Sequence, residues 1–296
     1  MKPLQFSAPT SLDEALSLLS GAGDGAGVLS GGTDLIIQYR EGLRDIGQMV
    51  DIKKIPELNV LEFDPVTGLR LGAAVSCALL GEFAPAREIY PGLVEGAELI
   101  GSTQIQNRAT VGGNLCNGSP AADSVCSLMV LNAVCIVAGS GGKREVPAVE
   151  FMTGPGQTAL QAGELLVEIR VPTPAPNSSD AYLRFIPRNE MDIAVAGTAV
   201  ALTLEDDKQT VKAAVIAIGA VAPTPLMVPA AGKALTGTAL TGGQMDDAAL
   251  EAAARASEAA ANPISDVRGT VEFRTHLAGV LTRRAAVIAN NRAAAN

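Results

Sequence analysis

The sequence has no tryptophan, a single histidine and four cysteines among its 296 residues. So few histidines and cysteines leave little material for a metal centre, and no C-x-x-C pair of the kind that holds zinc or an iron–sulfur cluster occurs. Four cysteines are also too few for a disulfide scaffold and are typical of a reducing compartment. We therefore predict no metal-binding residue in this chain and expect a cytoplasmic protein.

Long apolar runs and basic clusters are missing as well. The apolar stretch 128–137 is broken by polar residues well short of the ~20 residues that span a bilayer, and the first residues lack the apolar core of a signal peptide. The chain carries 22 Lys and Arg against 31 Asp and Glu, a formal charge of −9. An acidic chain without a basic run is poorly suited to nucleic acid or an anionic membrane. We expect neither membrane insertion nor nucleic-acid binding.

What the sequence does contain is enough apolar surface for a folded core, since hydrophobic residues make up 48% of it. The first fifty residues alternate as strand, helix, strand, helix, strand. Ser11 and Glu14 form a capping box that begins the first helix. Gly42 stands where a second helix, from Leu35, would end. This alternation favours a small parallel sheet.

The pattern changes after residue 53. Two strands around the turn 64–68 predict a hairpin over residues 58–74, and a helix is expected over 93–100. Three apolar segments follow a glycine-rich stretch: 128–137, 145–151 and 165–171.

The segment TPAPNSS, residues 173–179, is the strongest linker signal in the chain. After it we predict a three-stranded meander and then two helices. The strands are expected at 182–186, 194–204 and 211–221, and the helices at 245–261 and 269–290. The sequence thus predicts an α+β chain in three parts, residues 1–54, 55–175 and 176–296.

The first candidate site is SGGTD, residues 30–34, between a buried strand and a helix. Glycines let the backbone approach a ligand closely, and free amides at a helix start attract phosphate. The Thr33 hydroxyl can add a hydrogen bond. This is neither GxGxxG nor a P-loop, because the GK[ST] ending is missing. Taken alone, the pattern leaves a plain structural turn open.

The second candidate site is TVGGN, residues 110–114, followed by a polar stretch that ends at Asp123. Two loops of this kind would clasp a diphosphate from opposite sides, with Asp123 accepting a hydrogen bond from a ribose hydroxyl. Two unrelated loops are the alternative.

Taken together, SGGTDL (30–35), IGSTQIQNRATVGGN (100–114) and SPAAD (119–123) resemble the FAD-binding, or medium, subunit of the molybdenum hydroxylases. That family includes xanthine dehydrogenase, carbon monoxide dehydrogenase and 4-hydroxybenzoyl-CoA reductase. The resemblance extends through ELLVEIRVP (164–172) and through a spaced pattern formed by Tyr182, Arg184, Arg188, Asp192 and Ala194. It implies an FAD-binding fold of the vanillyl-alcohol-oxidase (PCMH) type in two subdomains. A C-terminal α+β domain with a three-stranded antiparallel sheet and helices would follow.

The resemblance also implies which residues hold FAD, without a covalent bond. Asp123 would bind the adenosine ribose and Leu166 would pack near the adenine. Arg184 matches a family position near the flavin that is often Lys, and Ile100 matches one that is aromatic in some relatives. The implied cofactor-binding residues are Val28, Leu29, Ser30, Gly31, Gly32, Thr33, Asp34, Leu35, Ile100, Thr110, Val111, Gly112, Gly113, Asn114, Asp123, Leu166 and Arg184.

By the same resemblance, the chain is an electron-transfer subunit. A large partner subunit would carry the molybdopterin cofactor, and a small one would carry two [2Fe–2S] clusters. FAD would then pass electrons to an external acceptor, in a dimer of heterotrimers. We assign no catalytic acid or base, and we predict that the only histidine, His276, is a structural or surface residue rather than a catalytic base or a covalent flavin anchor. Two alternatives stay open, a free-standing FAD enzyme that oxidises a small substrate and a non-redox nucleotide-binding scaffold.

Overall fold

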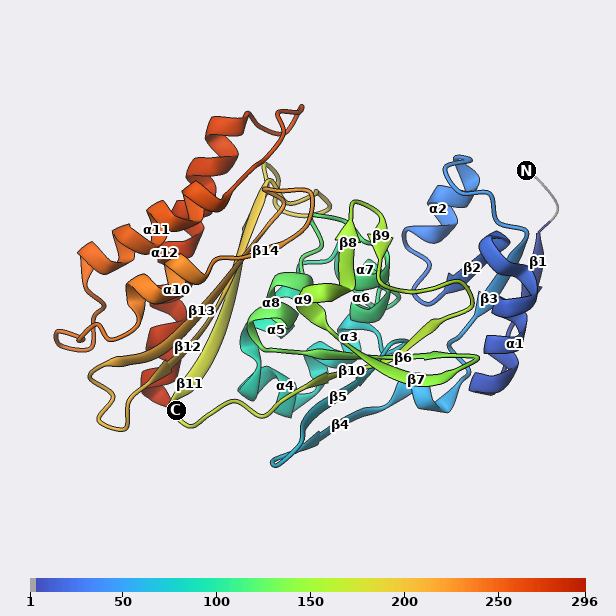
Figure 1. The fold of residues 1–296 in the computed structure, drawn as a ribbon, viewed down its shortest axis with the longest axis horizontal. Helices are drawn as coiled ribbons and strands as arrows, with labels where there is room; N and C mark the ends of the chain where they lie inside the picture. The colour runs from blue at the N-terminus through green and yellow to red at the C-terminus, as the bar shows by residue number, and fades with distance from the viewer. Residues whose placement is uncertain (1–3) are drawn as a thin grey trace.

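The computed structural model describes residues 4–296 and arranges them as three larger sheets with helices around them (Figure 1). The first sheet is parallel, in the order β1-β3-β2. Its elements are β1 (Gln5–Ser7), α1 (Leu12–Ala22), β2 (Ala26–Leu29), α2 (Leu35–Arg40) and β3 (Gln48–Asp51). Ser11 caps α1 by accepting from the Glu14 amide at 3.3 Å. The predicted strand–helix alternation and parallel sheet are confirmed.

The second sheet has five antiparallel strands in the order β4-β5-β10-β6-β7. They are β4 (Leu61–Asp64), β5 (Gly68–Gly72), β6 (Val134–Gly139), β7 (Gly142–Pro147) and β10 (Leu165–Val171). The hairpin begins at residue 61, later than predicted, because Pro56 opens a short 3-10 turn, Pro56–Asn59.

Seven short helices and a small hairpin lie beside this second sheet. The apolar run 128–137, which the sequence presented as one segment, divides between helix α8 (Val125–Val130) and strand β6, with a turn at Asn132, whose φ is 54°. The helices are α3 (Cys77–Glu82), α4 (Ala84–Ile89), α5 (Pro91–Glu98), α6 (Thr103–Gln106), α7 (Val111–Cys116), α8 (Val125–Val130) and α9 (Ala148–Phe151). The hairpin pairs β8 (Met152–Gly154) with β9 (Gln157–Thr158).

The third sheet is antiparallel and has four strands rather than the three predicted. They are β11 (Ser178–Phe185), β12 (Ala196–Leu204), β13 (Val211–Gly219) and β14 (Leu226–Met227). The additional strand, β14, has two residues, too few to produce an alternating pattern. β11 also takes in the last two residues of the predicted linker. The helices α10 (Pro229–Leu235), α11 (Asp247–Ala260) and α12 (Val271–Ala295) accompany this sheet.

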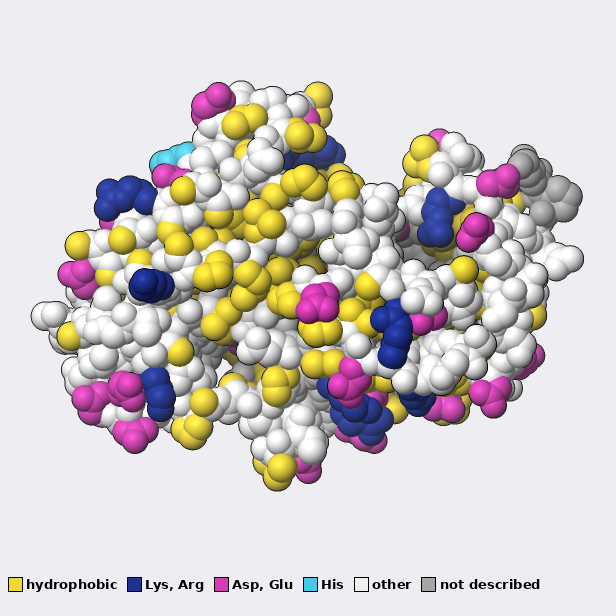
Figure 2. Space-filling model, in the orientation of Figure 1, with side chains coloured by type: hydrophobic (Ala, Val, Ile, Leu, Met, Phe, Trp, Pro, Cys, Tyr) yellow, Lys and Arg dark blue, Asp and Glu magenta, His cyan; other side chains and the backbone are white. Residues whose placement is uncertain are grey.

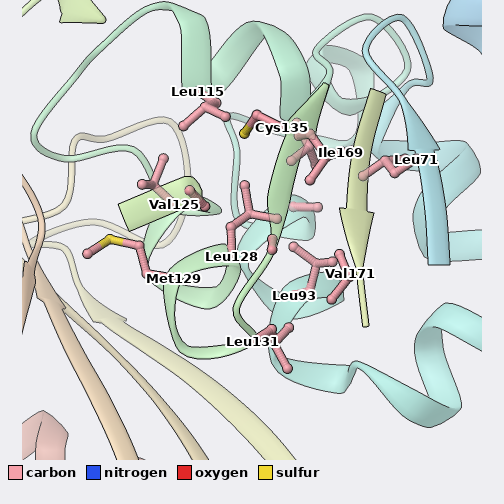
Figure 3. Packing of buried hydrophobic residues seen from close by; sticks show 14 of the residues in the cluster. Leu71, Leu93, Leu115, Val125, Leu128, Met129, Leu131, Cys135, Ile169 and Val171 are labelled. Carbon is pink, nitrogen blue, oxygen red and sulfur yellow. The ribbon is translucent and has the colours of Figure 1, made fainter. Parts of the chain in front are cut away.

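The largest hydrophobic core joins the second sheet to the short helices. Leu115 of α7, Leu128 of α8 and Ile169 of β10 are fully buried in the same cluster (Figure 3). This packing holds α7, and with it the TVGGN sequence, against the sheet. A separate core lies in the C-terminal part, between the third sheet and its helices. Within residues 4–296, no helix is both long and apolar enough to cross a membrane.

Candidate cofactor-binding site

A cavity of about 720 Å³ lies where the first and second sheets meet. Cavities of about 300–1,000 Å³ are typical of ligand and cofactor sites. Three segments supply most of its walls: the loop from β2 into α2, the first turn of α7, and residues 156–166. In Figure 2 the outline of the molecule is notched between the lobe that carries α2 and the rest of the chain.

The two glycine loops meet through a buried chain of hydrogen bonds. The hydroxyl oxygens of Ser30 and Thr110 lie 3.0 Å apart. Ser30 Oγ also donates to the carbonyl oxygen of Ala73 at 3.1 Å. Thr110 Oγ1 accepts from the Gly113 amide at 2.8 Å, and so caps α7. The sequence placed only the first loop at a helix start. The structure shows that the second loop also begins a helix, α7, and brings both loops together on one cavity.

Glycine is required in these loops chiefly where two backbone segments touch. A Cβ on Gly31 would overlap the carbonyl oxygen of Arg108, and a Cβ on Gly112 would lie 2.7 Å from the carbonyl oxygen of Ala73. Gly32 has a φ of 79°, which favours glycine. The close approach that the sequence suggested toward a ligand is thus, at residues 31 and 112, an approach of the protein to itself.

Side chains outside the glycine loops hold the same walls. Lys53 Nζ donates to the carbonyl oxygen of Ser30 at 3.1 Å and pairs with Asp51 at 2.6 Å. Gln38 of α2 donates to Asn117 Oδ1 at 2.9 Å, which links α2 to the end of α7 in addition to the Ser30–Thr110 contact between the two loops. Both faces of the cavity are therefore fixed by contacts within the chain.

The donor set suits an anionic ligand. The helix start at α7 leaves its first amides without intrahelical partners, and the Thr33 hydroxyl and Arg44 stand in the same walls. Three carboxyl groups, of Asp24, Asp34 and Glu164, also stand in these walls. Burial raises the pKa of Asp34, and Glu164 is paired with Arg144 at 2.7 Å. Amides, hydroxyls and a guanidinium are the groups that bind a diphosphate. The residues present therefore fit a dinucleotide such as FAD.

Most residues that the sequence singled out line this cavity. The lining residues among them are Val28, Ser30, Gly31, Gly32, Thr33, Asp34, Leu35, Ile100, Thr110, Gly112, Gly113, Asn114 and Leu166. Leu29 and Val111 lie behind the wall, where both side chains are buried in hydrophobic clusters. The wall formed by residues 156–165 was missed, and its only sequence signals are the turn residues Pro155–Gly156 and Ala162–Gly163.

Asp123 and Arg184 are not among the lining residues. They bind each other instead, with Arg184 Nη1 2.6 Å from Asp123 Oδ2, and both side chains are less than one-tenth exposed. Tyr182, which in the sequence is only one member of the spaced pattern 182–194, donates to Asp123 Oδ1 at 3.0 Å. Burial raises the pKa of Asp123 to about 6, opposed by Arg184 and Tyr182. A buried carboxylate needs such partners. The contacts of Asp123 and Arg184 with a cofactor stay predictions.

Comparisons with known proteins agree over nearly the whole chain. Residues 2–174 match the family described as FAD binding domain in molybdopterin dehydrogenase, and residues 181–288 match the CO dehydrogenase flavoprotein C-terminal domain. The chain is 37% identical over 290 residues to a carbon monoxide dehydrogenase medium chain from Afipia carboxidovorans, covering 97% of each. It is 32% identical over 274 residues to a xanthine dehydrogenase FAD-binding subunit from Escherichia coli O157:H7, covering 92% of this chain and 91% of the other.

The structure agrees as well. A chain of a carbon monoxide dehydrogenase from Hydrogenophaga pseudoflava superposes with a TM-score of 0.92 at 34% identity, and the match covers 98% of both chains.

Proposed function

The chain belongs to the family of FAD-binding medium subunits of the molybdopterin dehydrogenases, and we propose that it holds FAD in the cavity between residues 30–35 and 110–114. The resemblance and the fold class predicted from the sequence are confirmed by the family matches and the structural comparison. The chain is therefore the FAD subunit of a molybdenum hydroxylase complex, and an oxidoreductase component rather than a scaffold.

One observation carries the location of the site. Two loops, one after β2 and one at the start of α7, are joined by the Ser30–Thr110 hydrogen bond and line the same cavity. In this proposal Gly32, Thr33 and the start of α7 bind the diphosphate. Ile100 and Leu166 supply apolar wall for the ring systems. When bound, FAD supplies the redox chemistry, because it can take up electrons singly and release them in pairs.

We propose that the cofactor is held without a covalent bond. Histidine and cysteine are the residues that would link a flavin covalently. The histidine, His276, is on α12, which supplies no lining residue of the cavity, and the cavity walls include one cysteine, Cys116. Burial raises the pKa of the Cys116 thiol to about 12, so it is protonated and a poor nucleophile at neutral pH. The chain's own part is to bind and orient the cofactor and exclude water from it. No side chain is assigned as a catalytic acid or base.

Relatives called medium chains imply a larger and a smaller partner subunit. We propose that the large partner carries molybdopterin and meets the substrate, and that the small partner carries [2Fe–2S] clusters. Electrons would leave through this subunit to an external acceptor, in a dimer of heterotrimers.

Titration of the FAD-free chain with FAD and with ADP tests the proposal. We expect one FAD per chain, bound more tightly than ADP because the apolar wall adds contacts to the flavin. A chain that binds ADP but not FAD would contradict it.

A further inference from the structure

A second buried network lies at the junction between the third sheet and the helices of the second. Tyr182 and Arg184 are two residues apart on β11, so their side chains share one face of the strand. The Tyr182 phenol and the Arg184 guanidinium donate to different oxygens of Asp123, at 3.0 and 2.6 Å. The C-terminal sheet thus holds both carboxylate oxygens of a residue that belongs to the FAD-binding part.

The sheet is shaped to accept this contact. A Cβ on Gly197 of β12 would lie 2.5 Å from the Tyr182 phenol oxygen. Gly219 of β13 pairs with Gly197, and a Cβ there would lie 2.8 Å from the Cys126 sulfur of α8. Two paired glycines therefore let the Tyr182 phenol and the beginning of α8 lie directly on the sheet.

The segment held in this way reaches the cofactor cavity. The carbonyl oxygen of Pro120 accepts from the Ala220 amide of the C-terminal part at 2.8 Å. Ser124, which follows Asp123, donates its hydroxyl to Asn114 Oδ1 at 2.7 Å. Asn114 lines the cavity. Residues 120–124 thus connect the C-terminal sheet to the cavity wall.

We propose that Tyr182 is a positioning residue for the cofactor site: by holding Asp123 it fixes residues 120–124, and through Ser124 the Asn114 wall of the cavity. This inference rests on the proposed function, because it requires FAD in that cavity. Tyr182 is not a lining residue and acts through Asp123. The C-terminal sheet then completes a site whose lining residues all lie between Leu19 and Leu166.

The charges around Asp123 provide a measurement that a purely structural tyrosine would not affect. The groups that face its carboxylate are Tyr182 and Arg184 from β11 and Cys126 from α8. The Tyr182 hydrogen bond favours the ionised carboxylate, so its removal raises the pKa of Asp123 further above its present value of about 6. FAD binding that requires the ionised Asp123 carboxylate then reaches half of its full affinity at a higher pH.

The test compares Tyr182→Phe with Tyr90→Phe in the full chain, by FAD titration from pH 5 to 8. Tyr90 is a matched control, because its buried hydroxyl donates to the carbonyl oxygens of Val171 and Pro172 and is not bonded to Asp123. For Tyr182→Phe we expect the Kd for FAD at pH 7 to rise roughly tenfold and the pH midpoint to move up by about one unit. Tyr90→Phe should leave both unchanged.

Gly197→Ala is an independent second variant, since it keeps the Tyr182 hydroxyl but displaces it. It should move the midpoint in the same direction as Tyr182→Phe, and it decides the question if Tyr182→Phe does not fold. A wild-type Kd and midpoint in a folded Tyr182→Phe or Gly197→Ala chain would overturn the proposal. A wild-type chain that binds no FAD would overturn the proposed function instead.

Discussion

The hydroxyl oxygens of Ser30 and Thr110 lie 3.0 Å apart although 80 positions separate them in the chain. Each also bonds the backbone, Ser30 at Ala73 and Thr110 at Gly113, so that one chain of hydrogen bonds joins the end of β2 to the start of α7. The two loops are therefore fixed relative to each other by the protein itself. A site that is already formed loses less entropy when its ligand binds.

Thr110→Val should weaken FAD binding roughly tenfold, because it removes the Ser30 contact and leaves the Gly113 amide without its cap. Thr110→Ser keeps the hydroxyl and should restore most of the affinity. Fluorescence titration of FAD with the two variants measures the difference. Equal Kd values for Thr110→Val and the wild type would show that the Ser30–Thr110 link does not shape the site.

Gly32→Ala and Gly42→Ala form a matched pair, since these glycines have φ values of 79° and 71°. Each substitution should lower stability by roughly 1–2 kcal/mol through backbone strain. Only Gly32 lines the cavity, where an added Cβ would lie 2.7 Å from Leu29 Cδ1. We expect Gly32→Ala alone to lose FAD affinity. If both variants bind FAD like the wild type, residues 30–34 are only a structural turn.

The FAD-free chain should become less stable as the pH rises from 5 to 8. Asp180 is fully buried, accepts from the Leu93 amide at 3.1 Å, and has one oxygen, Oδ1, without a hydrogen-bond partner among residues 4–296. Burial and the nearby Glu95 raise its pKa from 3.8 to about 7, against the effect of Arg292. A carboxyl with a raised pKa binds more protons in the folded chain than in the unfolded chain. Its contribution to the free energy of unfolding is therefore fully present below pH 3.8 and is lost as the pH rises through about 7. Asp123 acts in the same direction, with a pKa of about 6.

Thermal unfolding of the wild type and Asp180→Asn at several pH values measures this effect. Glu164 and Glu168 have lowered pKa values, so their contributions to stability are lost only as the pH falls below their ordinary pKa of 4.5. That change lies outside the range of pH 5 to 8. The variant should show a smaller fall in Tm between pH 5 and 8. A wild-type slope in Asp180→Asn would contradict the assignment of this titration to Asp180.

Acid precipitation of the purified protein should release all of its FAD into the supernatant. The one cysteine in the cavity wall, Cys116, has a thiol pKa raised by burial to about 12, which disfavours attack on the flavin. The absorption spectra of pellet and supernatant measure the distribution. Flavin that stays with the pellet would indicate a covalent bond and favour a free-standing oxidase.

How far the sequence could predict the fold depended on how local the signals were. The cap at Ser11 and the strand–helix alternation are local, and the first sheet follows from them. β14 consists of two residues that pair only because β13 lies beside them, so no local pattern marks it.

The same distinction applies to the site. The loops at residues 30–34 and 110–114 carry glycine and hydroxyl signatures that could be found in the sequence. Of the wall at residues 156–166, the sequence pointed to Leu166, whereas residues 156–163 are largely irregular and carry only turn signals. The contact between Asp123 and Tyr182 joins parts of the chain that only tertiary packing brings together, and the sequence pattern gave Tyr182 no role in it.

Anaerobic mixing with small organic substrates and carbon monoxide, while the flavin absorption band is followed, tests the central claim most directly. The isolated FAD-loaded chain should keep its flavin oxidised with each of them. Addition of the proposed molybdopterin and iron–sulfur partner subunits should allow one of these substrates to bleach the band. Rapid bleaching in the isolated chain would contradict the account, because this subunit would then oxidise a substrate without its partners.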